Sequence, residues 1–174
     1  MPQSVPSFAE LLRKTRNSAV HLEMRDVYGV ADEAEDFEAW RAGRRIDWDN
    51  REEWWHDFYA QVAEAVARGV RVRRARVISE PVTDYIRYEH YITRANLMVG
   101  EDVRWLPRRW ASDIALPGND FWLFDQRLVR FNHFTGDGQF VAQELEDDPA
   151  VVKLCSAAFE AVWMRAVPHE EYRP

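Results

Sequence analysis

The chain has 174 residues, 47% of them apolar, which is enough for one domain with a sizeable core. Its formal charge of −7 argues against a generic nucleic-acid binder, whose affinity comes from a basic face. One cysteine, Cys155, excludes an internal disulfide, and the chain shows neither an apolar signal core nor an apolar run of about 20 residues, so we expect a cytoplasmic protein that does not span a membrane.

The first two-thirds of the sequence predict helices and strands in alternation. The expected helices are 7–16, 32–43, 50–69 and 83–100, and the expected strands are 19–28, 70–79 and 101–107. Ser7 and Glu10 form a capping-box pattern at the start of the first helix. Valine alternates with arginine over 70–79, with a change of phase expected near Ala75. Aromatic and β-branched residues in 83–100 leave a strand open for part of that segment.

The last third predicts a strand meander closed by a helix. Its expected strands are 120–125, 128–134 and 139–145, and its expected helix is 147–168. The turn at Gln126-Arg127 joins the first two strands. The order of elements predicts the α/β class, with a mixed central sheet flanked by helices. We expect an N-terminal helical arm over 1–18 and a single domain over 19–174.

Three segments carry a first resemblance. They are SAVHLEMRD, the pattern F-x-x-W-x-x-G formed by Phe37, Trp40 and Gly43, and DFWLFDQRLVRFNHF. With these segments the chain resembles an uncharacterised actinobacterial family that is often encoded beside helix-turn-helix regulators. The resemblance implies a regulatory context and a protein partner of that kind.

A second, more distant resemblance concerns the fold. The order of elements from about residue 50 onward, including GEDVRWLP at 100–107, is similar to one half of the phospholipase D-like fold. Non-catalytic relatives close with a helix of pattern F-E-x-x-W-x-x-A-x-P, which is matched here by Phe159, Glu160, Trp163, Ala166 and Pro168. Because active single-motif relatives pair two halves, the resemblance also implies a possible homodimer.

The active motif of that family, His-x-Lys-x-x-x-x-Asp, is missing its two reactive groups here. If Asp125 takes the Asp place, Asp120 stands in the Lys place and Gly118 in the His place. Asp120 also brings negative charge to the position where a phosphate would sit. Phosphodiester hydrolysis by this route is therefore not expected.

Two carboxylates are candidates for acid–base chemistry. Asp125 and Glu160 would form a pair if the hairpin packs on the final helix, and burial would raise one pKa. The alternative is that Asp125 accepts backbone N–H bonds in the turn that follows, as Asp commonly does. His90 is a third catalytic candidate, which would meet His133 in a pocket; the alternative is that both are partly exposed aromatic residues.

Arginine, tyrosine and tryptophan give candidates for ligand binding. The candidate ligand-binding residues are Arg87, Tyr88, Arg104, Trp105 and His133. Arginine and tyrosine bind carboxylates, phosphates or flat rings, which favours a ligand pocket or a partner-binding face. The alternative is a solvated helix with surface salt bridges, which would show the same residues. We interpret the basic run 70–76 as a half-exposed strand facing acidic neighbours such as 32–38. Cys155 is expected to be an inert buried thiol. No metal site or cofactor is expected. The histidines and the cysteine do not show the spacing of metal ligands, and the sequence has no glycine-rich phosphate-binding loop.

The leading hypothesis is a non-catalytic regulatory or sensory binding module that acts with a DNA-binding regulator and recognises a protein partner or small ligand. The first alternative is a small cytoplasmic enzyme on a phospholipase D-like scaffold, with a rebuilt site around Asp125, Glu160, His90 and Arg87. The second is a toxin or antitoxin component. Direct nucleic-acid binding is not expected.

Overall fold

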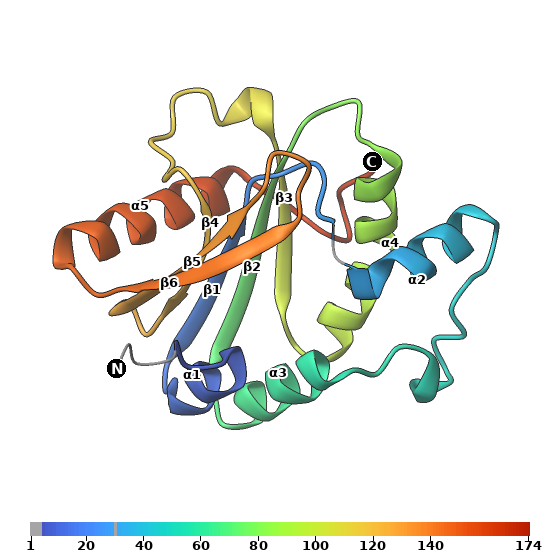
Figure 1. The fold of residues 1–174 in the computed structure, drawn as a ribbon, viewed down its shortest axis with the longest axis horizontal. Coiled ribbons are helices and arrows are strands. Elements are labelled where there is room, and N and C mark those ends of the chain that lie inside the picture. Colours follow the sequence, from blue (N-terminus) through green and yellow to red (C-terminus); the bar gives the residue numbers. More distant parts are fainter. Residues whose placement is uncertain (1–4, 30) are drawn as a thin grey trace.

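A seven-stranded mixed sheet forms the centre of the molecule (Figure 1). The computed structural model describes residues 5–29 and 31–174. The strands are β1 Ser18–Glu23, β2 Arg71–Ile78, β3 Asp102–Pro107, β4 Asp120–Phe124, β5 Leu128–Phe134, β6 Phe140–Glu146 and β7 Val167–Pro168. They lie in the order β6-β5-β4-β1-β2-β3-β7. Strands β1, β2 and β3 are parallel and the remaining pairings are antiparallel, which confirms the predicted α/β class and mixed sheet.

Helices cover both faces of this sheet. They are α1 Phe8–Lys14, α2 Ala31–Arg41, α3 Asp57–Ala67, α4 Asp84–Met98 and α5 Pro149–Arg165, with short 3-10 turns at Arg51–Glu53 and Arg108–Trp110. Helix α5 packs on one face, whereas α1, α3 and α4 pack on the other. Figure 1 shows α1 and α3 side by side, and α2 beside α4. None of the helices in the described ranges is both long and apolar enough to cross a membrane.

The alternation along β2 assigns its side chains to these two faces. Ala75 and Val77 belong to the core beneath α5, together with Leu22 of β1. Val72 and Ile78 belong to the cores under the other helices. The expected change of phase near Ala75 is wrong, because the alternation continues unbroken along the strand. Arg74 and Arg76 therefore face the same side as Val72.

Local signals define several of the helix ends. Ser7 and Glu10 form the predicted capping box of α1. Thr83 caps α4, and its side chain accepts a hydrogen bond from the backbone N–H of Ile86 at 3.1 Å. Segment 84–98 is helical throughout, so the alternative of a strand there is excluded. Leu11 and Leu12 of α1 pack into the same core as α3.

The predicted continuous helix over 50–69 is wrong. A 3-10 turn covers Arg51–Glu53, and α3 begins only at Asp57, after extended backbone at His56 with φ of −130°. The helix-like spacing of the aromatic residues comes from ring packing, since Trp54 contacts both Trp48 and Tyr59. Because the helix is interrupted, the aromatic segment before α3 lines a cavity.

The predicted ends of one strand and of one helix also need correction. Strand β1 ends at Glu23, and the next backbone N–H, that of Met24, donates to the carboxylate of Asp120 at 2.9 Å. At the C-terminus, 167–168 forms strand β7 beside Trp105 of β3, where the sequence predicted the end of a helix. Two residues are too few to show a strand period in sequence.

Candidate functional site

A cleft with two chambers lies between the sheet and helices α2, α3 and α4. The inner chamber, of about 420 Å³, lies against the sheet. The outer chamber, of about 690 Å³, lies between α2, α4 and the segment before α3. Glu33, Phe58, Tyr59 and Ile92 line both chambers, so the two adjoin. The size is that of sites that hold small molecules.

Aromatic rings make the walls of the outer chamber. They are Trp40, Trp48, Trp54, Trp55, Phe58, Tyr59, Tyr88 and Tyr91. The rings pack on one another, with centroids 5.7 Å apart for Trp40 and Tyr88 and 5.6 Å apart for Trp48 and Tyr91. Trp54 is only 7% exposed, and its indole N–H has no hydrogen-bond partner among the residues described. The chamber therefore offers flat apolar surfaces and an unused donor.

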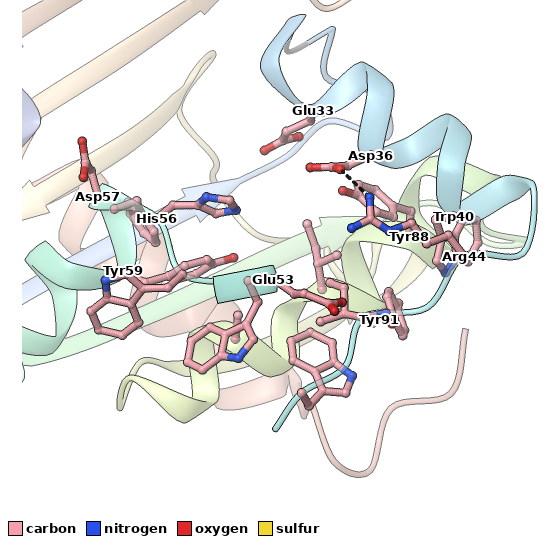
Figure 2. Close-up of a pocket in the computed structure, with 17 residues that line it drawn as sticks. Glu33, Asp36, Trp40, Arg44, Glu53, His56, Asp57, Tyr59, Tyr88 and Tyr91 are labelled. Carbon is pink, nitrogen blue, oxygen red and sulfur yellow. Dashed lines mark hydrogen bonds and ion pairs between the residues drawn. The ribbon is translucent and has the colours of Figure 1, made fainter. Parts of the chain in front are cut away.

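Helix α2 carries acidic side chains over this chamber. Glu33, Asp36 and Trp40 recur at steps of three and four residues, so they share one face of the helix. Figure 2 shows Glu33 and Asp36 extending from α2 toward the cavity, across from His56 and Tyr59. Asp36 forms an ion pair with Arg44 at 3.7 Å. Glu33 instead accepts a hydrogen bond from the hydroxyl of Tyr85 at 3.1 Å.

Two buried arginines of β2 form the floor of the inner chamber. Arg74 contacts Glu101 at 2.8 Å and Glu23 at 3.1 Å. Arg76 contacts Glu23 at 3.2 Å and also pairs with Glu89. Burial alone would lower the pKa of each arginine, but the paired carboxylates raise both above the ordinary value. Burial alone would raise the pKa of Glu23, yet Arg76 and Arg74 lower it to about 2. These arginines are neutralised within the protein and are not free to hold a phosphate.

Two other carboxyls of the inner chamber have no cationic partner. Among the residues described, neither Glu33 nor Asp120 forms an ion pair with an arginine, lysine or histidine. Asp120 is 3% exposed and accepts hydrogen bonds from the Tyr28 hydroxyl and the Met24 N–H. Burial raises the pKa of Asp120 to about 7, and the nearby charge of Glu23 adds to the effect. Burial and then Glu89 raise the pKa of Glu33 to about 7.

The hydroxyl of Tyr85 lies between two of these carboxyls. It is 3.1 Å from an oxygen of Glu33 and 3.1 Å from an oxygen of Glu89. A phenol has one proton to donate, so both contacts are satisfied only if one carboxyl carries its own proton. Below about pH 7 that carboxyl is Glu33, whose pKa is raised to about 7 and which then donates to Tyr85, whereas Glu89 is paired with Arg76.

The two predicted catalytic carboxylates occupy separate structural positions. Asp125 accepts the backbone N–H groups of Arg16, Asn17 and Ser18 at 2.7–3.0 Å, and these contacts lower its pKa against the opposing effect of burial. The donors lie at and just before the start of β1, not in the turn that follows β4. Glu160 forms an ion pair with Arg73 at 2.6 Å on the α5 side of the sheet. Neither residue lines the cleft.

The predicted histidines also lie apart. His90 stacks on His169 with centroids 4.2 Å apart, beside Trp105. Trp105 is fully buried and donates from its indole to His169 at 3.1 Å. His133 lies on β5 and pairs with Glu144 of β6 at 3.2 Å. The sheet order separates β5 from β3 by three strands, so the structure does not bring His90 and His133 together.

The predicted arginine cluster does not form. Arg87 is on the surface of α4 and pairs with Asp84 at 3.3 Å. Arg104 lies on the α5 side, with its guanidinium carbon 4.3 Å from the ring centroid of Trp163. Tyr88 is the only one of the predicted ligand-binding residues that lines the cleft within the described part of the chain. The basic run of β2 is not half-exposed, since Arg74 and Arg76 are buried against Glu23, Glu89 and Glu101.

Sequence reasoning left the cleft itself undetected. Glu33 and Asp36 share a helix face with Trp40, which is a signal of carboxylates turned inward. Asp120 alternates with Trp122 and Phe124 in a strand whose five residues are all buried, so an inward-facing carboxyl was detectable there. Glu89 follows Tyr85 by one helical turn. What the sequence does not contain is the packing of α2 over α4, which brings these groups together.

No group of three or more histidine, cysteine or acidic residues in the described ranges is arranged to hold a metal ion. Cys155 is buried in the core under α5, as predicted, and burial raises the pKa of its thiol to about 11.

The sheet order, the helices on both faces and the β4–β5 hairpin define a phospholipase D-like fold. The structure is similar to Nuc from Salmonella typhimurium, a phospholipase D family member, with 12% identity, coverage of 95% of this chain and 88% of that one, and a TM-score of 0.50. It is also similar to NucT from Helicobacter pylori, with 10% identity, coverage of 92% and 87%, and a TM-score of 0.48. The archaeal chromatin protein TrmBL2 has 15% identity, coverage of 91% of this chain and 47% of that one, and a TM-score of 0.47.

The chain belongs to the family described as domain of unknown function DUF6879, whose match spans residues 6–174. No curated protein matches the sequence.

Proposed function

We propose that this protein is a regulatory or sensory module that binds a small ligand in the cleft and does not hydrolyse phosphodiesters. One observation carries the proposal: Asp120, which takes the Lys place of the phospholipase D motif if Asp125 takes the Asp place, lines a chamber that opens onto an aromatic one. With that alignment, the inner chamber adjoins the position of the missing Lys and could hold a small ligand.

The charges of the cleft support the loss of phosphodiester chemistry. A phosphate needs free cationic donors, and both Arg74 and Arg76 are already engaged by buried carboxylates. Asp120 would repel the phosphate oxygens whenever it is ionised. A ligand of another kind is therefore the better occupant.

The regulatory part of the proposal follows from the resemblance of the sequence. In this proposal the gene is actinobacterial and lies beside that of a helix-turn-helix regulator, and the protein works with that regulator in the cytoplasm, as a monomer or a homodimer. The net charge of −7 leaves DNA contact to the regulator. Ligand binding would shift the position of α2 against α4 and so change the surface presented to the partner.

A second candidate is an enzyme with an acid–base site in the same cleft. Two carboxyls with pKa values of about 7, Glu33 and Asp120, favour it, because a proton carrier works best near its own pKa. The residues differ from Asp125, Glu160, His90 and Arg87, which do not converge. Conversion of a bound compound by the wild-type protein, abolished in Asp120→Asn, would favour the enzyme over the sensor.

The test is purification of the tagged full chain from its native host, followed by mass spectrometry of bound small molecules and proteins. We expect a small molecule and a DNA-binding regulator to be recovered. Trp55→Ala removes a half-buried wall of the outer chamber and should reduce recovery of the small molecule by about tenfold. Trp110→Ala is the matched control, because Trp110 is 45% exposed and lies outside the cleft. Recovery of neither kind of partner at good yield contradicts the proposal.

A further inference from the structure

We propose that the ligand is an organic cation, a protonated amine whose charge is held in the inner chamber by Glu33 and Asp120 and whose body lies against the aromatic outer chamber. This inference rests on the proposed function and names the chemical class of its ligand.

The balance of charges around the cleft is the first argument. The carboxylates that line it are Glu23, Glu33, Asp36, Glu53, Asp57, Glu89 and Asp120, and the arginines are Arg44, Arg74, Arg76 and Arg130. Burial lowers the pKa of His21 well below its ordinary value, so this nearby histidine is neutral and adds no positive charge. Even when Glu33 and Asp120 are protonated, five carboxylates face four arginines, and ionisation of these two carboxyls increases the excess of negative charge, which attracts a cation.

The second argument is that several acceptors of the inner chamber lack a cationic partner among the residues described. Glu33 and Asp120 each have tyrosine hydroxyls as partners but no cation. Asn132 lies opposite Asp120 in the β4–β5 ladder, and its side-chain oxygen has no donor among the residues described. His21 is 7% exposed and lines the same chamber, and its Nδ1, 3.8 Å from an oxygen of Glu23, has no hydrogen-bond partner within the described part of the chain. An ammonium group supplies the three donors that such a set of acceptors requires.

The aromatic walls are the third argument. Ring faces attract cations, and guanidinium groups of this chain already lie over five of these rings, Trp55 and Phe58 among them. Arg45 is 5.4 Å from the ring centroid of Trp40 and 5.6 Å from that of Tyr91, and Arg94 is 5.2 Å from that of Trp48. The rings also give a hydrocarbon or flat ligand body a large apolar surface.

Arg130 is the one lining arginine for which no ion pair is found among the described residues. Its guanidinium lies over the ring of Phe8, 5.9 Å from the centroid. A carboxylate on the ligand would find its partner there, so an amino acid satisfies the same chamber at both ends. The ligand still needs an ammonium group, because among the described residues the chamber has two carboxyls without a cationic partner and only one arginine without an anionic partner.

The inference is tested with four probes of matched size and titration calorimetry on the full chain. The probes are phenethylamine, phenylalanine, 2-phenylethanol and 3-phenylpropionate. We expect phenethylamine to bind at least about tenfold more tightly than the alcohol, and the propionate to bind more weakly than both. Phenylalanine should match or exceed the amine if Arg130 takes the carboxylate.

Substitutions in the cleft separate recognition of charge from shape. Glu33→Gln should weaken binding of phenethylamine by about tenfold and leave binding of 2-phenylethanol unchanged. Glu38→Gln removes the same charge from the same helix outside the cleft, where Glu38 pairs with Arg41, and should change neither. Asp120→Asn should weaken binding of phenethylamine in the same way. If Asp120→Asn does not fold, Glu33→Gln alone tests the inference.

Proton release gives a readout that a merely structural role would not change. Because a bound ammonium favours ionised Glu33 and Asp120, affinity should rise from about pH 6 to about pH 8, with protons released to the buffer. The groups that face these carboxyls are Tyr85, Glu89, Glu23 and Arg76 around Glu33, and Tyr28, Glu23 and Arg25 around Asp120.

Equal binding of alcohol and amine, tighter binding of the propionate, or failure of the amine to bind at millimolar concentration overturns the inference. The proposed function survives any of these results if a neutral or anionic compound is recovered from the native host and is lost in Trp55→Ala. The proposed function is contradicted together with the inference only if no small molecule is recovered.

Discussion

At the scale of single residues, buried ion pairs join separate elements of the fold. Arg74 and Arg76 lie on β2, and their partners come from the end of β1, from α4 and from the residue just before β3. Glu101 is 2% exposed and also accepts a hydrogen bond from Asn96 of α4 at 2.6 Å. Each carboxylate is thus paired and hydrogen-bonded, which is the condition under which buried charge is tolerated.

Asp125 is a structural residue with a measurable contribution to stability. Replacing it in Asp125→Ala leaves three backbone N–H groups at the start of β1 without their acceptor, so we expect a loss of about 2 kcal/mol in the free energy of unfolding. Urea denaturation measures the loss. Arg127→Ala is the control, because this exposed side chain touches Asp125 only at 4.0 Å. Binding of a cleft ligand should be unchanged at concentrations where both variants are folded; lost binding would place Asp125 in a site.

At the scale of elements, α4 is the helix on which the cleft depends. Its inward face carries Tyr85 and Glu89 to the inner chamber, and Tyr88 and Tyr91 to the outer one. These positions recur at steps of three and four residues. The helix begins at a fixed position because Thr83 both caps it and donates to the carbonyl of Asp26 at 3.1 Å.

Thr83→Ala should lower the free energy of unfolding by about 1 kcal/mol, because the cap of α4 and the bond to Asp26 are both lost. Thr83→Ser keeps the hydroxyl and should restore most of that stability. Thermal or urea unfolding of the two variants checks the difference. Equal loss in both would mean that the methyl group, and not the cap, stabilises the helix.

At the scale of the whole molecule, the cleft is a product of how α2 packs on α4. Phe37 contacts Tyr85 and Tyr88 with centroids 5.6 and 5.4 Å apart, and Trp40 contacts Tyr88. These contacts hold the acidic face of α2 above the sheet. The resulting burial of carboxyls makes the stability of the molecule depend on pH.

Asp120→Asn should change that dependence in a defined direction. The unfolded chain releases the Asp120 proton near pH 4, whereas the folded protein retains it until about pH 7, so the contribution of Asp120 to stability falls as pH rises through this window. Asparagine does not titrate. The stability of the variant relative to wild type should therefore rise between about pH 4 and about pH 7, by at most about 4 kcal/mol.

Urea unfolding at several pH values measures the effect. Asp113→Asn is the control, since Arg165 lowers the pKa of that exposed carboxyl and its replacement gives no gain with rising pH. Parallel profiles of Asp120→Asn and wild type would mean that folding does not raise the pKa of Asp120.

Local sequence signals predicted the fold class and most of the elements, but not the break before α3, the end of β1 or strand β7. Capping signals, the 3.6-residue period of 83–98 and the alternation of 120–134 are local, and they placed α1, α4 and the β4–β5 hairpin correctly. The resemblance to the phospholipase D-like fold came from the order of elements and the closing helix. It also singled out Asp120, by its alignment with a catalytic Lys.

Only the tertiary structure decided which side chains meet. Glu33, Glu89 and Asp120 come from three elements far apart in the sequence, and no local pattern reports their convergence. The arginines of β2 appeared half-exposed because alternation gives a face but not its burial, which depends on the helices that cover it. Burial and the distance between charged groups set the pKa values of a site, so its chemistry becomes visible only when the elements are packed.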